Sequence, residues 1–324
     1  MNALIEKYQN EVVEIDYQAA VNSICENMRN AMRTELHRRG AVVAVSGGID
    51  SSVCAALSTK AFGANKTFLL KLPETDSAEN TQSRSSELIQ LLGTQHTTFN
   101  IAPVLEAIGC YSARDEAIRK VFPDYTKNWK SKIVIKGGTE GQINHFILVV
   151  QKPDGSIDEK RLDLKEYLQI VAATNHKQRI RKTVEYYHAD RLNYAVIGTP
   201  NLLEYDQGFF VKNGDGSADL KPIAHLYKTQ VYKMARHLEL PESICDAEPT
   251  TDTYSMPQGQ DEFYFALPYK QMDMALWAFN ENLSADDLAS MLDISNSQAA
   301  YVFSDIENKR RTTAYLHKSA LLVG

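Results

Sequence analysis

The amino-acid sequence predicts an α/β fold in which a parallel sheet is flanked by helices. Short apolar runs typical of buried strands alternate with amphipathic segments along most of the 324 residues. Right-handed crossovers through such helices make neighbouring strands parallel. A glycine-rich run at residues 46–52 directly follows one apolar run, at the sheet edge where folds of this class bind their ligands.

The first hundred residues carry this alternation. Ile24, Met28 and Met32 recur at helical spacing, whereas residues 41–45 form a continuous apolar run of strand length. In chain order we expect a helix at 16–39, a strand at 41–45, a helix at 52–60, a strand at 67–72, a helix at 76–92 and a strand at 97–101.

Residues 131–162 break the alternation and predict a β-rich insertion. Three strand-like runs, at 132–136, 145–151 and 156–162, flank a strong turn signal at Lys152-Pro153-Asp154-Gly155. Antiparallel pairing follows from the short connection between the last two runs. An extra surface or dimer-contact element is the interpretation we favour over a docking site for a partner protein.

After the insertion the α/β rhythm returns. We expect a basic helix at 176–192, a strand at 194–198 and a helix at 226–238, followed by two short helical patterns between residues 283 and 306. Residues 1–274 then form the main domain, and residues 275–324 a helical extension packed on it. The last helix pair also resembles a helix-turn-helix, but terminal helix pairs are usually packing elements.

Composition narrows the class of protein. Apolar residues make up 44% and charged residues 23%, as in ordinary globular proteins, and the net charge of −6 argues against broad nucleic-acid binding. No apolar run is long enough to span a membrane, and residues 1–10 lack a signal-peptide core. The cysteines (Cys25, Cys54, Cys110 and Cys245) form no Cys-x-x-Cys pair, which favours reduced thiols and a cytoplasmic location.

The run Ser46-Gly47-Gly48-Ile49-Asp50-Ser51-Ser52 predicts a pyrophosphate cradle. Its glycines allow a tight turn, its hydroxyls add donors, and the following helix contributes its N-terminus. Asp50 would repel a phosphate unless a cation bridged them, so we interpret it as a Mg²⁺ ligand. An ordinary glycine-rich turn is the alternative; a Walker loop is excluded because no Gly-Lys-Ser/Thr follows.

Three later residues are candidates for the same site. Glu204 follows the strand at 194–198, so it could complete the Mg²⁺ site with Asp50; a surface carboxylate is the alternative. Lys228 begins a helix and could reach phosphate, or it could be a solvated lysine. Asp215 lies in Asn-Gly-Asp-Gly, which by itself is simply a turn.

Taken together, these runs resemble NAD synthetases of the ATP pyrophosphatase (adenine nucleotide alpha hydrolase-like) superfamily. The resemblance rests on motifs in family order: residues 46–52, Asn175 to Arg181, Gly198-Thr199 with Glu204, residues 209–219, Tyr227 to Gln230, residues 249–252, Asp261-Glu262 and Asn308-Lys309-Arg310. It implies a Rossmann-like sheet. Phe265-Ala266 and Asn308 depart from the Leu-Gly and His of the family pattern.

The resemblance also implies residue roles. ATP would contact Ser46, Gly47, Gly48, Asp50, Ser51, Ser52, Arg179, Thr199, Lys228 and Thr250. Lys212, Asp215 and Asp219 would bind the pyridine dinucleotide, Asp50 and Glu204 would hold Mg²⁺, and Asp50, Lys212 and Lys228 would be catalytic. Family members are homodimers.

The implied reaction is the ATP-dependent amidation of nicotinic acid adenine dinucleotide (deamido-NAD) to NAD, through an acyl-adenylate and with release of AMP and pyrophosphate. About forty residues precede the first strand, too few for the amidase domain of glutamine-dependent relatives, so we expect ammonia as the nitrogen donor. Whether a separate glutaminase docks on the chain and allows it to use glutamine stays open. The alternatives are the same chemistry on another carboxylate, or a non-catalytic nucleotide sensor that binds DNA.

Overall fold

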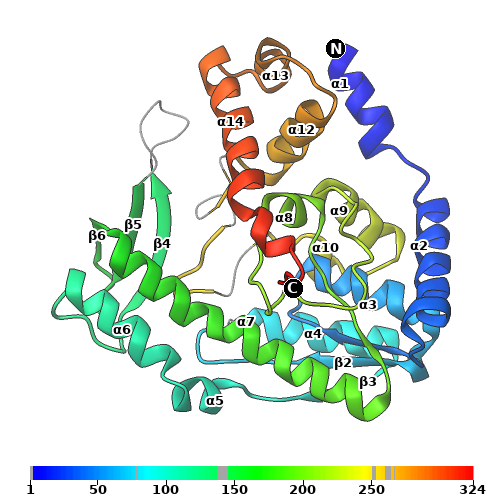
Figure 1. The fold of residues 1–324 in the computed structure, drawn as a ribbon, viewed down its shortest axis with the longest axis horizontal. Helices are drawn as coiled ribbons and strands as arrows, with labels where there is room; N and C mark the ends of the chain where they lie inside the picture. Colours follow the sequence, from blue (N-terminus) through cyan, green and yellow to red (C-terminus); the bar gives the residue numbers. More distant parts are fainter. Residues whose placement is uncertain are drawn as a thin grey trace.

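A four-stranded parallel sheet forms the centre of the computed structural model, which describes residues 3–77, 79–136, 145–249, 253–259, 264–265 and 267–323. Its strands are β1 (Ala41–Ala44), β2 (Thr67–Lys71), β3 (Gln95–Thr98) and β7 (Ala195–Val196), in the order β3-β2-β1-β7. The predicted α/β fold with a flanked parallel sheet is therefore confirmed (Figure 1).

Both faces of the sheet are covered because successive strand residues point in opposite directions. Val43 and Leu69 face one core, shared with α2 (Tyr17–Ala31), α3 (Ile49–Phe62) and α9 (Lys228–His237). Val42 and Leu70 face another, shared with α5 (Ala102–Ala107), α6 (Cys110–Val121) and α7 (Leu164–Leu192). The remaining helices are α1 (Ala3–Tyr8), α4 (Glu79–Leu92), α8 (Leu202–Gln207), α10 (Glu242–Cys245), α12 (Tyr269–Asn280), α13 (Ala285–Leu292) and α14 (Asn296–Thr313).

Several predicted boundaries are wrong, among them the end of the third strand and the starts of two helices. The third strand ends at Thr98, not 101, because the Asn100 side chain accepts from the Ala102 amide and starts α5. Helix α7 begins at Leu164, twelve residues before the predicted 176, and α3 begins at Ile49, inside the glycine-rich run. Helices α5 and α6 were not predicted at all.

The insertion is a separate antiparallel sheet, as predicted. Its strands are β4 (Lys130–Lys136), β5 (His145–Gln151) and β6 (Ile157–Arg161), in the order β4-β5-β6. Ile133 and Leu148 pack with Ile118 of α6 and Ile170 of α7 in one buried cluster. The insertion therefore packs against α6 and α7, which also cover one face of the central sheet (Figure 1).

The C-terminal helices α12, α13 and α14 pack around a core of their own with the N-terminal segment. Tyr8 contacts the Trp277 ring edge to face, and Leu288, Val302 and Ile306 are buried in the same cluster. The helix pair that resembles a helix-turn-helix thus turns apolar side chains into this core. Among the described residues, no helix is both long and apolar enough to cross a membrane.

Candidate active site

The glycine-rich run forms a tight loop between β1 and the N-terminus of α3. Gly47 has φ of +75°, and a Cβ there would lie 2.6 Å from the Thr81 carbonyl oxygen, so the loop requires glycine. The Ser46 and Ser51 hydroxyls lie 3.2 Å apart, and the Gly48 amide donates to Ser46 Oγ at 3.2 Å. Ser52 is buried, and its hydroxyl donates to the Gly48 carbonyl at 2.8 Å. The loop therefore has the tight turn, the hydroxyls and the helix N-terminus on which the prediction of an anion cradle depends.

Asp50, in the first turn of α3, forms an ion pair with Lys228 at the first position of α9. Lys228 is 1% exposed, whereas the Asp50 side chain is 17% exposed. Burial opposes the charge on Lys228, but Asp50 and Glu204 outweigh it and raise the pKa of the amine. Lys228 is therefore held as a cation beside the phosphate loop.

Asn201 connects the two carboxylates of the site. Its Nδ2 donates to Asp50 Oδ1 at 3.0 Å, and its backbone amide donates to Glu204 Oε2 at 3.3 Å in a capping box that starts α8. Both carboxylates thus accept from Asn201, Asp50 from its side chain and Glu204 from its backbone amide. Mg²⁺ is usually bound by one or two carboxylates together with substrate phosphates, so this donor set fits it.

One cavity of about 540 Å³ gathers most of the predicted site residues. Its lining includes Ser46, Gly48, Asp50, Ser51, Arg179, Thr199, Glu204, Lys212, Asp215 and Lys228. Gly47 and Ser52 lie behind it in the loop, and Thr250 lies outside the described residues. Residues from α3, α7, α8 and α9 thus meet at the carboxyl edge of the sheet, as expected for an open α/β fold.

Known proteins resemble this chain in sequence along most of its length. A model of the family described as NAD synthase matches residues 20–135 and 140–315. The chain belongs to the NAD synthase family. The NH(3)-dependent NAD(+) synthetase of Rhizobium rhizogenes is 50% identical over 314 residues, which cover 97% of this chain and 95% of that protein. The NH(3)-dependent NAD(+) synthetase of Thermotoga maritima is 34% identical over 78% of this chain and 85% of its own length.

Two solved structures share the fold. The NMN synthetase of Francisella tularensis superposes with a TM-score of 0.65 at 22% identity, over 96% of this chain and 99% of that one. The NH3-dependent NAD synthetase of Campylobacter jejuni, solved with a nitrate ion, gives a TM-score of 0.62 at 21% identity, over 96% and 100%. These likenesses show the shared fold; the family match and the 50% identical relatives show that the chain is an enzyme of NAD formation.

The three residues assigned to the dinucleotide lie in different surroundings. The Lys212 amine donates to the carbonyls of Tyr315 and Lys318, at 2.7 and 2.8 Å, so the end of the predicted C-terminal extension, which the sequence analysis did not assign to the site, borders it. Asp215 is half-buried; its loss of solvation raises its pKa, and its carboxylate accepts from the Val211 amide at 2.7 Å. Asp219 does not line the cavity; its carboxylate accepts from the Val196 amide at 2.7 Å.

Sequence reasoning missed several polar residues of this site, among them Asn201, Lys182 and Glu185. Asn201 was part of a quoted motif without a role, although Asn-x-x-Glu is a recognisable capping-box signal. Lys182 and Glu185 form a buried ion pair at 2.7 Å on α7 and line the cavity. Their spacing of three residues is helical, but nothing local distinguishes a buried pair from a surface pair.

Proposed function

We propose that this chain catalyses the ATP-dependent amidation of deamido-NAD to NAD through an acyl-adenylate, with ammonia as nitrogen donor. The observation that carries the proposal is the Asp50–Lys228 ion pair beside the phosphate loop, in a cavity that also contains Lys212 and Asp215. A cation and a partly exposed carboxylate at a helix N-terminus suit a triphosphate with its metal. The family match supports the same reaction.

The first step needs stabilisation of phosphate charge. An oxygen of the pyridine carboxylate bonds to the α-phosphorus of ATP, and pyrophosphate leaves with the electrons of the broken bond. We propose that Lys228, together with Ser46, Gly48 and Ser51 of the cavity lining, stabilises the charge that develops on the phosphate oxygens. We propose that Asp50 and Glu204 hold Mg²⁺, which when bound neutralises phosphate charge.

The second step makes the amide. Ammonia adds to the acyl carbon, the tetrahedral intermediate expels AMP, and the nitrogen gives up a proton to solvent. No protein nucleophile is needed, because adenylation has already supplied a good leaving group. Our assignment of Lys212, Asp215 and Asp219 to the dinucleotide, and of Arg179, Thr199 and Thr250 to ATP, stays a prediction from the family resemblance.

We also propose that the protein is a homodimer in the cytoplasm. The cysteines Cys25, Cys54, Cys110 and Cys245 are all buried free thiols, which suits a reducing compartment. Light scattering on the purified chain measures the mass: twice the chain mass supports the dimer, and a monomer contradicts it. A glutaminase partner is tested by comparing ammonium with ammonia-free glutamine as the nitrogen source, with purified protein and with cell extract.

The reaction is tested by incubating the purified chain with deamido-NAD, ATP, Mg²⁺ and ammonium chloride. NAD, AMP and pyrophosphate should form in equal amounts. Formation of ADP and phosphate would contradict the adenylation mechanism. Because the fold is shared with an NMN synthetase, the corresponding mononucleotide acid is the competing substrate to include. If the mononucleotide acid reacts and deamido-NAD does not, the proposed adenylation mechanism would stand but the proposed substrate would be wrong.

A further inference from the structure

The insertion contacts a segment that lines the active-site cavity. The Ser131 amide of β4 donates to Ser255 Oγ at 2.9 Å, and the Met256 amide donates to the Ser131 carbonyl at 3.2 Å. The Gln258 side-chain amide donates to the Ile133 carbonyl further along the strand. Residues 255–258 therefore lie along the edge of β4, while Thr253 and Tyr254 just before them line the cavity.

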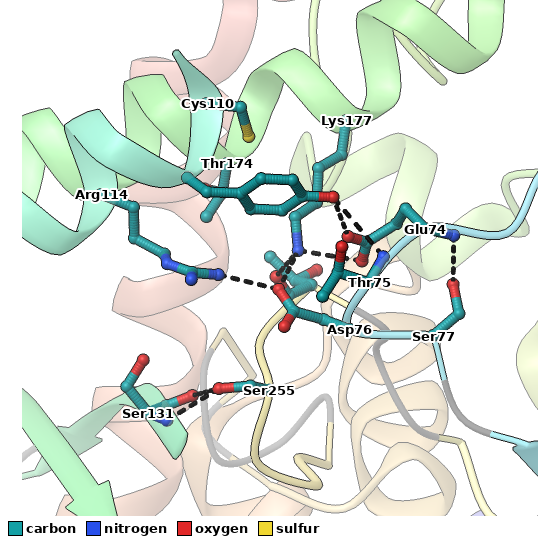
Figure 2. A network of polar contacts seen from close by, with 12 residues as sticks. Glu74, Thr75, Asp76, Ser77, Cys110, Arg114, Ser131, Thr174, Lys177 and Ser255 are labelled. Carbon is teal, nitrogen blue, oxygen red and sulfur yellow. Dashed lines mark hydrogen bonds and ion pairs between the residues drawn. The ribbon is translucent and has the colours of Figure 1, made fainter. Parts of the chain in front are cut away.

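Lys177 of α7 holds the other end of the same segment. Its amine donates to the Thr253 carbonyl at 3.0 Å, to Asp76 Oδ2 at 2.7 Å and to Glu74 Oε1 at 3.0 Å. Arg114 of α6 reaches Asp76 at 2.8 Å, so α6, α7 and the segment after β2 meet there (Figure 2). All of these contacts lie next to the Ser131–Ser255 contact of the insertion (Figure 2).

The hydrogen bonds of Lys177 distinguish it from a ligand-binding lysine. An ammonium group has three donors, and Glu74, Asp76 and Thr253 accept all three. Lys177 is 1% exposed and the Glu74 side chain 0%, so moving the amine to a ligand would leave a buried carboxylate uncompensated. Although Lys177 lines the cavity, its contacts suit it to fix the cavity walls.

We propose that Lys177 and strand β4 clamp residues 253–258 between α7 and the insertion, and that this clamp sets the position of one cavity wall. Lys177 is then a positioning residue, and the insertion supports the active site instead of serving only as a surface element. The kinetic test of this clamp rests on the proposed reaction with ATP.

The sharpest variant is Ser255→Ala/Gln258→Ala. It removes side-chain hydrogen bonds to β4, and neither residue lines the cavity or belongs to a buried ion pair. The matched control is Lys136→Ala/Glu159→Ala, an exposed pair that joins β4 to β6 within the same sheet. We expect the clamp variant to raise the KM for ATP about ten-fold with kcat nearly unchanged, and the control to resemble the wild type.

Hydrogen exchange gives a readout that does not depend on the reaction. Amides of residues 253–258 should exchange faster in the clamp variant than in the control, and a non-cleavable ATP analogue should bind more weakly in calorimetry. If the wild type forms no NAD, the proposed function fails while these two measurements still test the clamp. Unchanged exchange would overturn the clamp, and faster exchange with unchanged ATP affinity and KM would overturn its role at the cavity.

Lys177 itself is tested by rescue. Lys177→Arg keeps a cation and several donors, so it should keep part of the ATP affinity that Lys177→Met loses. Both proteins are compared with the wild type only after circular dichroism shows that they are folded. Equal losses of affinity in the two variants, or none in Lys177→Met, would overturn the assignment of Lys177. If Lys177→Met does not fold, the Ser255→Ala/Gln258→Ala variant decides.

Discussion

Two of the buried lysines that line the cavity have partners of different kinds. Lys228 and Lys177 are each 1% exposed. Lys228 pairs with Asp50, whose side chain remains 17% exposed next to the phosphate loop. Lys177 donates to Glu74, Asp76 and the Thr253 carbonyl, in the polar network drawn in Figure 2.

The difference shows that partners decide what a buried lysine can do. The partner of Lys228 is accessible, so the pair can exchange contacts with an incoming phosphate and its cation at modest cost. Moving the amine of Lys177 would separate it from two buried carboxylates, which costs several kcal/mol. Lys228 is therefore suited to act on a substrate, and Lys177 to hold structure in place.

The largest expected effect is on the reaction rate. Asp50→Asn removes the carboxylate that pairs with Lys228 and that we assign to the metal, so kcat for NAD formation should fall by about 100- to 1000-fold. Steady-state kinetics with saturating ATP measures it. Asp246→Asn, in an exposed pair with Arg236, is the control and should match the wild type. A kcat for Asp50→Asn within about ten-fold of the wild type would refute a catalytic role.

The largest effect on stability should come from Lys177. Lys177→Met leaves Glu74 and Asp76 buried without their lysine, so the free energy of unfolding should fall by about 3–5 kcal/mol. Urea denaturation measures the change. Lys136→Met breaks an exposed pair in the insertion and should cost less than about 1 kcal/mol. Similar losses for the two variants would contradict the distinction between buried and exposed pairs.

The sequence predicted the parts of the site that are local. The phosphate loop is one continuous run, so its turn, hydroxyls and helix start could all be recognised together. The pairing of Asp50 with Lys228 joins residues 178 positions apart. The sequence analysis made both of them candidates for the phosphate site, but it did not predict their contact, because no local pattern connects them.

Lys177 was missed for the same reason. Its side-chain partners lie 101 and 103 positions away, and within the basic stretch at 176–192 it resembles a solvated lysine. The early start of α7 was also missed, although Leu164, Tyr167, Leu168 and Val171 recur at helical spacing in the sequence. Local periodicity does not predict burial that depends on distant segments of the chain.

A smaller effect on stability should follow from the removal of a single hydroxyl group in the network around Lys177. Tyr111 donates to Glu74 Oε2 at 2.8 Å, so Tyr111→Phe leaves a buried carboxylate oxygen with one donor fewer. The free energy of unfolding should fall by about 1–2 kcal/mol, less than for Lys177→Met. Tyr187→Phe, at an exposed tyrosine, is the matched control in urea denaturation. A loss as large as that of Lys177→Met would mean that the lysine is not the centre of the network.

The smallest expected effect is a change with pH in the stability that Asp76 contributes. Burial opposes its ionisation, but Lys177 and Arg114 outweigh it and hold the pKa of Asp76 below the ordinary value of 3.8. The unfolded chain therefore binds the proton more readily, and the stability that Asp76 contributes is complete above about pH 4 and is lost as pH falls toward the folded-state pKa. In urea denaturation, the stability difference between wild type and Asp76→Asn should be constant from pH 7 to 5 and narrow below pH 4. Asp273 is the opposite case, because burial raises its pKa to about 6. The contribution of Asp273 is present below about pH 4 and lost as pH rises through 6, so the difference between wild type and Asp273→Asn should shift in the opposite direction. A difference for Asp76→Asn that widens on acidification would mean that Lys177 and Arg114 do not stabilise its charge.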